Sequence, residues 1–363
     1  MKCVKCQADN KLKDRQANKG NCSNCKHPFT FDPKLSDGFT DPFFAKTLEA
    51  ISANNTLYFT PWQFYYFFNA RKYRNAFWWP GFIALALAVF FFFTGVWPLM
   101  FLFGLFAIVL WLPPVRRWLR SQTSQELKAT PKEIDEWLRR WQQNNGVVTK
   151  YLQMPSHPTA PAKVSQEISA YSFDRAVICD RDEIAHFLIA NNFHFENNCA
   201  VLSINGYPQS IFTTVLEMLH RNPQLKVYVL HDASPSGVQL VHRLRTTPRW
   251  FAASQGIAIF DLGLMPRQVM KRHMFVRQSD DCQQQVLALP EPVRNLLQPD
   301  ELKWLAAGKH VELESLSPLL LLKVLRDGIA KSRMPESDDA LVVISDTGYY
   351  GSDVSVYSVD SFG

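Results

Sequence analysis

The sequence predicts an α/β protein of several units: a small cysteine-rich unit at the N-terminus, a pair of apolar helices, and a C-terminal domain built on a mostly parallel sheet. Three observations predict this organisation. Four of the seven cysteines lie within the first 25 residues. A run of 41 residues, from Asn75 to Val115, contains no Asp, Glu, Lys, Arg or His. From Phe173 onward, short β-rich segments alternate with helical segments.

The charged residues are unevenly distributed. Residues 1–74 contain 12 Lys and Arg against 6 Asp and Glu, whereas 27 basic residues balance 27 acidic ones in the remainder. The part after the apolar run therefore has no broad positive field for nucleic acid. We divide the chain into a metal-binding unit (1–35), a pre-membrane segment (36–74), a helical hairpin (75–115), a connector helix with a proline-rich linker (116–165) and an α/β domain (166–363).

The N-terminal cysteines form two Cys-x-x-Cys pairs. Cys3 and Cys6 are separated by 15 residues from Cys22 and Cys25, a spacing that predicts one structural zinc ion held by four thiolates. The alternative is four unligated thiols in a reducing compartment. The segment resembles zinc ribbons, which bind DNA, RNA or protein. His27 follows the second pair, and we expect it to be a surface residue because four thiolates already complete the shell.

The apolar run predicts a transmembrane hairpin. Its 41 residues are about twice the ~20 that one spanning helix needs. We expect a turn at residues 94–98 between two short spans, residues 79–93 and 99–112. Neither span has a polar face, so we favour membrane insertion over a buried hairpin of a soluble protein.

Basic residues flank this run on both sides. The positive-inside rule therefore predicts that both termini lie in the cytoplasm. We expect an integral membrane protein that has the lipid bilayer as one partner. The flanking basic residues are Arg71, Lys72 and Arg74 before the run and Arg116, Arg117 and Arg120 after it.

The connector begins with a helix and continues as a linker. Thr130-Pro131-Lys132-Glu133 is a capping box with proline at the first helical position. Apolar residues follow at i, i+3, i+4 and i+7, and Asn145-Gly146 closes the helix. Residues 154–165 contain three prolines and indicate a linker.

The alternation after Phe173 predicts strands joined by crossover helices, and hence a mostly parallel sheet covered on both faces. Ligands of such sheets gather at the carboxyl ends of the strands. The expected strands are residues 176–179, 200–204, 226–230 and 256–260, and the residues at their ends are Asp180, Asn205, Gly206, Asp232, Ser234 and Asp261.

Two segments, VLSINGYP and VYVLHDASPSG, resemble the Toprim fold of topoisomerases, primases and related nucleases, most nearly that of the topoisomerase VI A subunit. The segment WLAAGKHVELESLSPLLLLKVLRDGI is similar to the one that follows the catalytic core of that subunit. The resemblance spans roughly Phe173 to Ile329. It implies a Toprim-like domain related to enzymes of phosphodiester chemistry.

In that fold three carboxylates bind magnesium: a Glu-Gly after one strand, and an Asp-x-Asp followed by Gly after another. The resemblance places Asn205 and Gly206 at the Glu-Gly, Asp232 and Ser234 at the two aspartates, and Gly237 at the later glycine. One carboxylate with an amide and a hydroxyl supplies a single negative charge. We therefore expect no working magnesium site and a domain without catalytic activity.

Two functions remain open at this point. We favour a membrane-anchored, non-catalytic protein in which the zinc ribbon and the α/β domain bind or scaffold a cytoplasmic protein partner. The alternative is a membrane-tethered, magnesium-dependent nuclease of Toprim type that completes its site with Asp180, Asp261 or a partner's carboxylate. Nucleic acid is the corresponding alternative partner.

Overall fold

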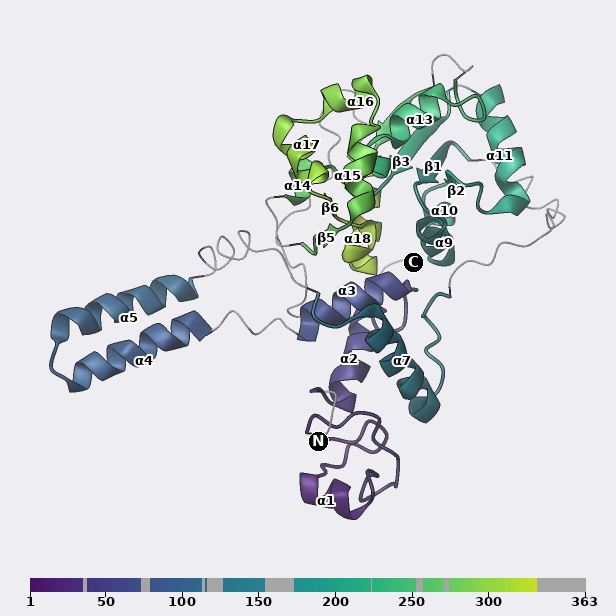
Figure 1. Cartoon of the computed structure of the whole chain (residues 1–363). Helices are drawn as coiled ribbons and strands as arrows, with labels where there is room; N and C mark the ends of the chain where they lie inside the picture. Colours follow the sequence, from purple (N-terminus) through teal and green to yellow (C-terminus); the bar gives the residue numbers. More distant parts are fainter. Residues whose placement is uncertain are drawn as a thin grey trace, which may run out of the picture.

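The computed structural model describes residues 1–34, 38–72, 79–112, 115, 127–153, 173–222, 224–252, 257–270 and 274–331. A cysteine-rich unit, a helical module, an apolar helical hairpin and an α/β domain are distinct in Figure 1. The helical module lies between the cysteine-rich unit and the α/β domain, and the hairpin projects to one side. The predicted linker at 154–165, the basic residues from Arg116 to Arg120 and the chain end after Lys331 lie outside the described residues.

The helical module joins two segments that are separate in the predicted organisation. The cysteine-rich unit contains the short helix α1 (Leu12–Ala17), and the module consists of α2 (Asp41–Ile51), α3 (Pro61–Lys72) and α7 (Pro131–Asn145). Aromatic rings dominate its core, where the centroid of Phe44 lies 5.1 Å from that of Trp141 and 5.6 Å from that of Phe64. The pre-membrane and connector segments therefore share one hydrophobic core.

The predicted capping box of α7 is confirmed. The backbone N–H of Glu133 donates to Thr130 Oγ1, and the Glu133 carboxylate accepts from the Thr130 N–H at 2.7 Å. Gly146 ends the helix with φ of +88°. These bonds satisfy backbone groups that helix ends leave without intrahelical partners.

The hairpin consists of α4 (Trp79–Phe93) and α5 (Trp97–Trp111), with the turn where the sequence predicted it. Small side chains, Ala84, Ala88 and Ala107, are buried between the helices, and the Phe91 and Phe103 rings stack at 5.5 Å. The predicted transmembrane spans are not supported, because no helix in the described ranges is long and apolar enough to cross a membrane. Each helix has 15 residues, a length of about 22 Å against a hydrocarbon core of ~30 Å.

The predicted parallel sheet is confirmed. Its strands run in the order β2-β1-β3-β4, and all three neighbouring pairs are parallel. Because β1 lies between β2 and β3, the end of β1 is next to the end of β3, whereas the end of β2 is not. The strands are β1 (Arg175–Cys179), β2 (Cys199–Ser203), β3 (Lys226–Leu230) and β4 (Ile259–Asp261).

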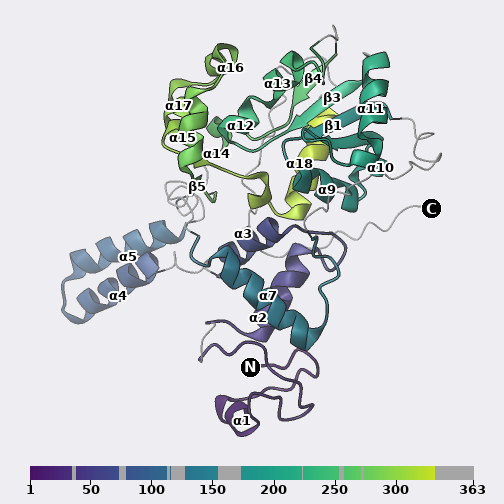
Figure 2. The same ribbon diagram turned by 45° about the vertical axis from the view of Figure 1, so that its right-hand side comes forward.

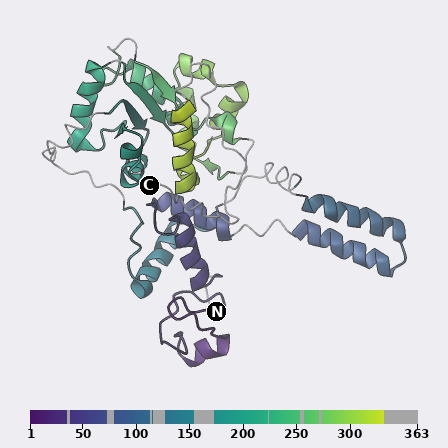
Figure 3. The same ribbon diagram turned by 180° about the vertical axis from the view of Figure 1, so that it is seen from behind.

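Helices cover both faces of this sheet, as the alternation predicted. Alternate residues of β1 face opposite layers: Val177 packs with α9 (Asp182–Ala190) and α18 (Pro318–Lys331), and Ile178 with α11 (Gln209–Arg221) and α13 (Leu240–Thr246). Both faces of each strand are thereby buried, which explains why the strands are apolar throughout. Figure 3 shows α18 beside the sheet with one end close to the helical module.

A satellite unit of short elements packs at one edge of the domain. Its core joins α15 to α17, together with Val238 of α12. Within it, the two-residue strands β5 and β6 pair antiparallel. The remaining elements are α10 (Phe193–Glu196), α12 (Pro235–Val238), α14 (Pro266–Val269), β5 (Arg277–Gln278), α15 (Asp280–Leu287), α16 (Glu291–Leu296), α17 (Pro299–Ala306), β6 (Lys309–His310) and the 3-10 helix η2 (Leu313–Ser315).

The helical module packs directly on the α/β domain, as Figure 2 shows for α3. The Asn191 side chain accepts from the Tyr58 N–H at 2.8 Å and donates to the Tyr58 carbonyl at 3.1 Å. Phe275, which follows the sheet in sequence, belongs to the core of the module and lies 5.4 Å from the Tyr66 ring. The two parts therefore share buried contacts.

Candidate functional site

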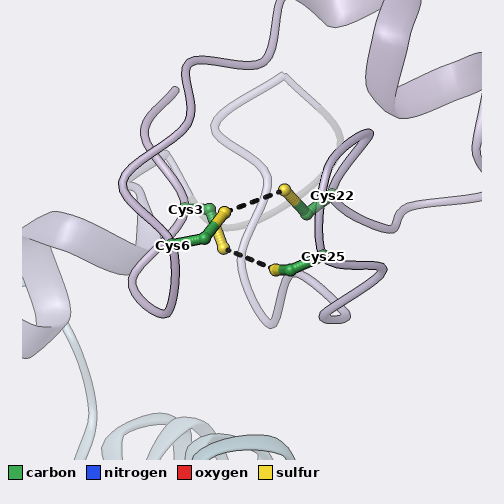
Figure 4. A group of neighbouring side chains, drawn as sticks. All are labelled: Cys3, Cys6, Cys22 and Cys25. Atoms are coloured by element: carbon green, nitrogen blue, oxygen red, sulfur yellow. Dashed lines mark hydrogen bonds between the residues drawn. The ribbon is translucent and has the colours of Figure 1, made fainter.

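Two groups of polar side chains are candidates for function: the four cysteines and the residues at the ends of the parallel strands. The four sulfur atoms lie within 4.8 Å of one another (Figure 4). The Cys3 and Cys25 sulfurs are 3.7 Å apart, and those of Cys6 and Cys22 are 3.6 Å apart. A tetrahedral ion with metal–sulfur bonds of about 2.3 Å separates its ligands by about 3.8 Å, so the spacing fits zinc.

The two cysteine pairs have the same backbone geometry. In each, the first cysteine carbonyl accepts from the residue after the second cysteine, which has positive φ: Gln7 at +60° and Lys26 at +58°. The first cysteine N–H in turn donates to the carbonyl of Ala8 or of His27. The structure thus builds two equivalent turns that present four sulfurs to one point. The expected polar hairpin between them is instead the helix α1.

Asn10 joins the two turns and was not identified from the sequence. Its buried side chain donates to the Ala8 carbonyl at 2.9 Å and lies 3.5 Å from the Cys22 sulfur. Its oxygen accepts from the Ser23 N–H at 2.8 Å. The backbone N–H of Cys25, followed by Asn24 and Asn10, lowers the pKa of the Cys22 thiol to about 6, and the thiolate is the form that binds metals.

The cysteine unit is fixed to the helical module. Asp41 at the start of α2 accepts from the N–H groups of Thr30 and Phe31 at 3.1 and 2.8 Å. His27, expected to be a surface residue, is half-buried and hydrogen-bonded to Asn145 at 3.0 Å. The unit therefore docks on α2 and α7 through buried polar contacts.

At the strand ends, the structure brings Asp180 and Asp232 together. Asp180 follows β1 and Asp232 follows the adjacent β3, and the Asp232 N–H donates to Asp180 Oδ2 at 2.8 Å. Burial, and next the charge of Asp232, raises the pKa of Asp180 to about 7. The sequence left two roles open for Asp180, helix cap and supplementary ligand, and the structure places it beside Asp232.

The structure does not bring Asn205 to this point. Asn205 follows β2, on the far side of β1 from β3, and its exposed side chain donates to Asp182 Oδ1 at 3.2 Å. Gly206 has φ of +102° in the same turn. The carry-over of the family's glutamate to Asn205 therefore does not match the neighbour relations of the strands, and Asp180 occupies the place beside Asp232.

Ser234 and Gly237 have structural roles in the turn after β3. Ser234 caps α12 by accepting from the Gly237 N–H at 3.1 Å. A Cβ at Gly237 would lie 2.2 Å from the Asp232 carbonyl oxygen, so the turn requires glycine there. This close approach explains the last glycine of the segment VYVLHDASPSG.

Arg181, which no sequence pattern indicated, lies between two carboxylates. Its Nη2 is 3.1 Å from Asp232 Oδ2, and its Nη1 is 3.0 Å from Glu314 Oε2. Although burial lowers it, the charges of Asp232 and Glu314 raise the pKa of Arg181 well above its ordinary value. Asp232 also accepts from the Leu313 N–H at 2.7 Å. The Asp232 carboxylate is therefore fully engaged by protein groups.

Two glutamates connect this cluster to α3. Glu314 accepts from the Thr60 hydroxyl, and Glu312 accepts from the Tyr66 hydroxyl at 2.7 Å and from Arg277 at 2.6 Å. All three side-chain partners of the glutamates arise far from them in sequence. Both glutamates lie in the HVELES part of the segment noted for its resemblance, which is the one signal that could have identified them.

Asp261, the other supplementary ligand considered, pairs with a buried histidine. His231 Nε2 lies 3.0 Å from Asp261 Oδ1, and His231 Nδ1 lies 2.8 Å from the Asp232 carbonyl. A carbonyl only accepts, so both ring nitrogens face acceptors and favour the imidazolium. Although burial lowers it, the Asp261 charge and hydrogen bond raise the pKa of His231 to about 9. A Cβ at Gly263 would lie 2.2 Å from this ring.

We expect the stability of the protein to fall with pH above neutrality because of His231. A folded-state pKa of about 9, above the ordinary value of 6.5, gives stability that is complete below pH 6.5 and lost as the pH rises through 9. The free energy of unfolding should fall by about 1 kcal/mol per pH unit in this window, the slope for one proton. Urea unfolding of the zinc-loaded chain from pH 7.5 to 9.5 measures it.

The matched variant is His231→Gln, which keeps a hydrogen-bonding side chain and cannot titrate. Its stability should be lower at neutral pH and should depend less on pH in the same window. An equal slope in the two proteins would assign the proton to another group.

Comparison with known proteins agrees with this domain assignment. Residues 176–319 match the family of the Toprim domain that topoisomerase 6, in its A subunit, shares with Spo11. No curated protein matches the chain. The match covers β1 to the start of α18, including Asp180, Arg181, Asp232 and both glutamates. The chain thus contains a Toprim-like domain preceded by a cysteine cluster that could hold a metal ion.

Proposed function

We propose that the protein is a membrane-associated, non-catalytic binding or scaffold protein. In this proposal the cysteine cluster holds a structural zinc ion, the apolar hairpin attaches the chain to a bilayer, and the Toprim-like domain binds a cytoplasmic protein partner. The observation that carries the non-catalytic part is the engagement of Asp232 by Arg181 at 3.1 Å. A cation supplied by the protein takes the coordination capacity that a catalytic magnesium ion would require.

Coverage of the strand ends also supports this part of the proposal. Glu314 is 0% exposed, and Thr60 and Tyr66 of the helical module donate to the two glutamates. A phosphodiester substrate needs access to the metal ligands, and these contacts would have to open first. The Toprim-like fold is therefore assigned here to binding, because fold alone does not imply activity.

The exposed side chains of the hairpin support attachment to a bilayer. Among the described residues, 17 of the 22 exposed large apolar side chains lie between Phe82 and Leu112. They lie on all sides of both helices, and such helices are buried in protein or in lipid. We propose that the hairpin enters the hydrocarbon region and returns to the side from which it started, with both termini in the cytoplasm.

A second function, a magnesium-dependent nuclease of Toprim type, is favoured by one observation. Asp180 and Asp232 lie at the ends of adjacent strands, with Asp180 Oδ2 2.8 Å from the Asp232 nitrogen. Two neighbouring carboxylates are a common magnesium-binding arrangement. This candidate requires Arg181 to leave Asp232, and it makes nucleic acid the partner.

We expect purified protein to carry about one zinc ion per chain, because four thiolates complete one tetrahedral shell. Elemental analysis measures the content, and Cys22→Ser should abolish it and lower the stability of the N-terminal unit. Cys282→Ser is the matched control, since Cys282 lies in α15 apart from the cluster. Full zinc content in Cys22→Ser, or a stable N-terminal unit without zinc in the wild type, would contradict the assignment.

We expect the full-length protein to float with phosphatidylcholine vesicles in a density gradient. The double variant Phe93→Glu with Leu105→Glu should remain with the soluble fraction, because both side chains are more than half exposed, at 81% and 63%, and charges are costly in hydrocarbon. Leu296→Glu, on α16 and 70% exposed, is the matched control and should still float. Equal flotation of all three proteins would remove the hairpin from the proposal.

We expect no magnesium-dependent cleavage of single- or double-stranded DNA or RNA by the zinc-loaded protein. Incubation with labelled substrates across a series of magnesium and manganese concentrations tests this. Asp232→Asn is the diagnostic variant, because it preserves the side-chain size and removes the charge. Cleavage by the wild type that Asp232→Asn abolishes would establish the nuclease function instead.

A further inference from the structure

The guanidinium of Arg181 joins carboxylates from distant parts of the chain. It contacts Asp232 after β3 and Glu314 in η2, at 3.1 and 3.0 Å. Asp180 lies immediately before it and hydrogen-bonds the Asp232 N–H. A single cation therefore stands among three acidic residues that arise from the ends of two strands and from η2.

The balance of charge around Arg181 is negative. We call Asp180, Asp232, Glu312 and Glu314 the strand-end cluster; its cations are Arg181 and Arg277. The Oδ1 atom of Asp180 is buried without a hydrogen-bond partner in the described part of the chain. Burial raises the pKa of Glu314 to about 7. Loss of one of these two cations would leave buried carboxylates without compensation, a change that costs several kcal/mol in proteins.

The strand-end cluster also determines how α3 is attached. Thr60, at the start of α3, donates to Glu314, and the fully buried Tyr66 donates to Glu312. Arg277 holds the other oxygen of Glu312 at 2.6 Å. The orientation of both glutamates, and with it the seat of α3, therefore depends on the two arginines.

We propose that Arg181 is the resident cation of the strand-end cluster: its guanidinium occupies the position from which a divalent cation could bridge Asp180, Asp232 and Glu314, and it holds the Toprim-like domain against α3 without a metal ion. Arg181 is thus a positioning residue that acts through the carboxylates. This inference deepens the non-catalytic function proposed above, since it names the group that replaces the metal.

Removal of the guanidinium should convert the cluster into a site for a divalent cation. Arg181→Ala should unfold at a lower temperature than the wild type in metal-free buffer. Manganese should restore part of that loss in the variant and leave the wild type unchanged. Manganese affinity, measured by electron paramagnetic resonance, should rise at least about tenfold in the variant, or about 1.4 kcal/mol. Full-length, zinc-loaded protein is used, without chelators that would remove zinc.

Arg249→Ala is the matched control. Arg249 lies in the same domain, stacked 4.6 Å from the Phe212 ring, and it makes none of the contacts to the strand-end cluster described above. Its unfolding temperature should not respond to manganese. If Arg181→Ala does not fold, Arg181→Lys replaces it: one positive charge remains, the two-carboxylate bridge is lost, and manganese should still stabilise the variant.

The inference is overturned if manganese stabilises wild type and variant equally, or if neither Arg181 variant responds to it. Wild-type nuclease activity would contradict the proposed function. Loss of the metal response in the variants, with an inactive wild type, would contradict the role of Arg181 alone.

Discussion

The ion pairs of Arg181 with Asp232 and Glu314 are the contacts on which the strand ends of this protein depend. Buried carboxylates are costly unless a cation and hydrogen bonds compensate them, and Arg181 compensates two at 3.1 and 3.0 Å. Glu314 also accepts from Thr60, which stands at the start of α3. The same pairs therefore determine both the electrostatics of the sheet edge and the seat of the helical module.

The strand ends as a whole are compensated by cations of the chain itself. Arg181 serves Asp232 and Glu314, Arg277 serves Glu312, and His231 serves Asp261. A magnesium site requires carboxylate oxygens that remain available to the ion. The Toprim-like architecture is retained here, while the chemistry of its strand ends is directed inward.

The helical module connects the other parts of the molecule. On one side it binds the cysteine unit through Asp41 and Asn145, and on the other it meets the sheet through Thr60 and Tyr66. Helix α3 ends at Lys72 and the hairpin begins at Trp79. The module is therefore placed to relate the cysteine unit, the hairpin and the Toprim-like domain, which suits a protein that holds partners in a fixed arrangement.

The sequence by itself determined the features that rest on local patterns. The cysteine spacing predicted one four-sulfur cluster, the capping box predicted α7 from residue 131, and the apolar runs predicted four parallel strands. Local preferences suffice for these features because neighbouring residues create them. Strand order decided the rest: β1 lies between β2 and β3, so Asp180, and not Asn205, stands beside Asp232. Arg181, Glu314 and Thr60 meet only in the folded chain, because no sequence period links residues separated by more than a hundred positions.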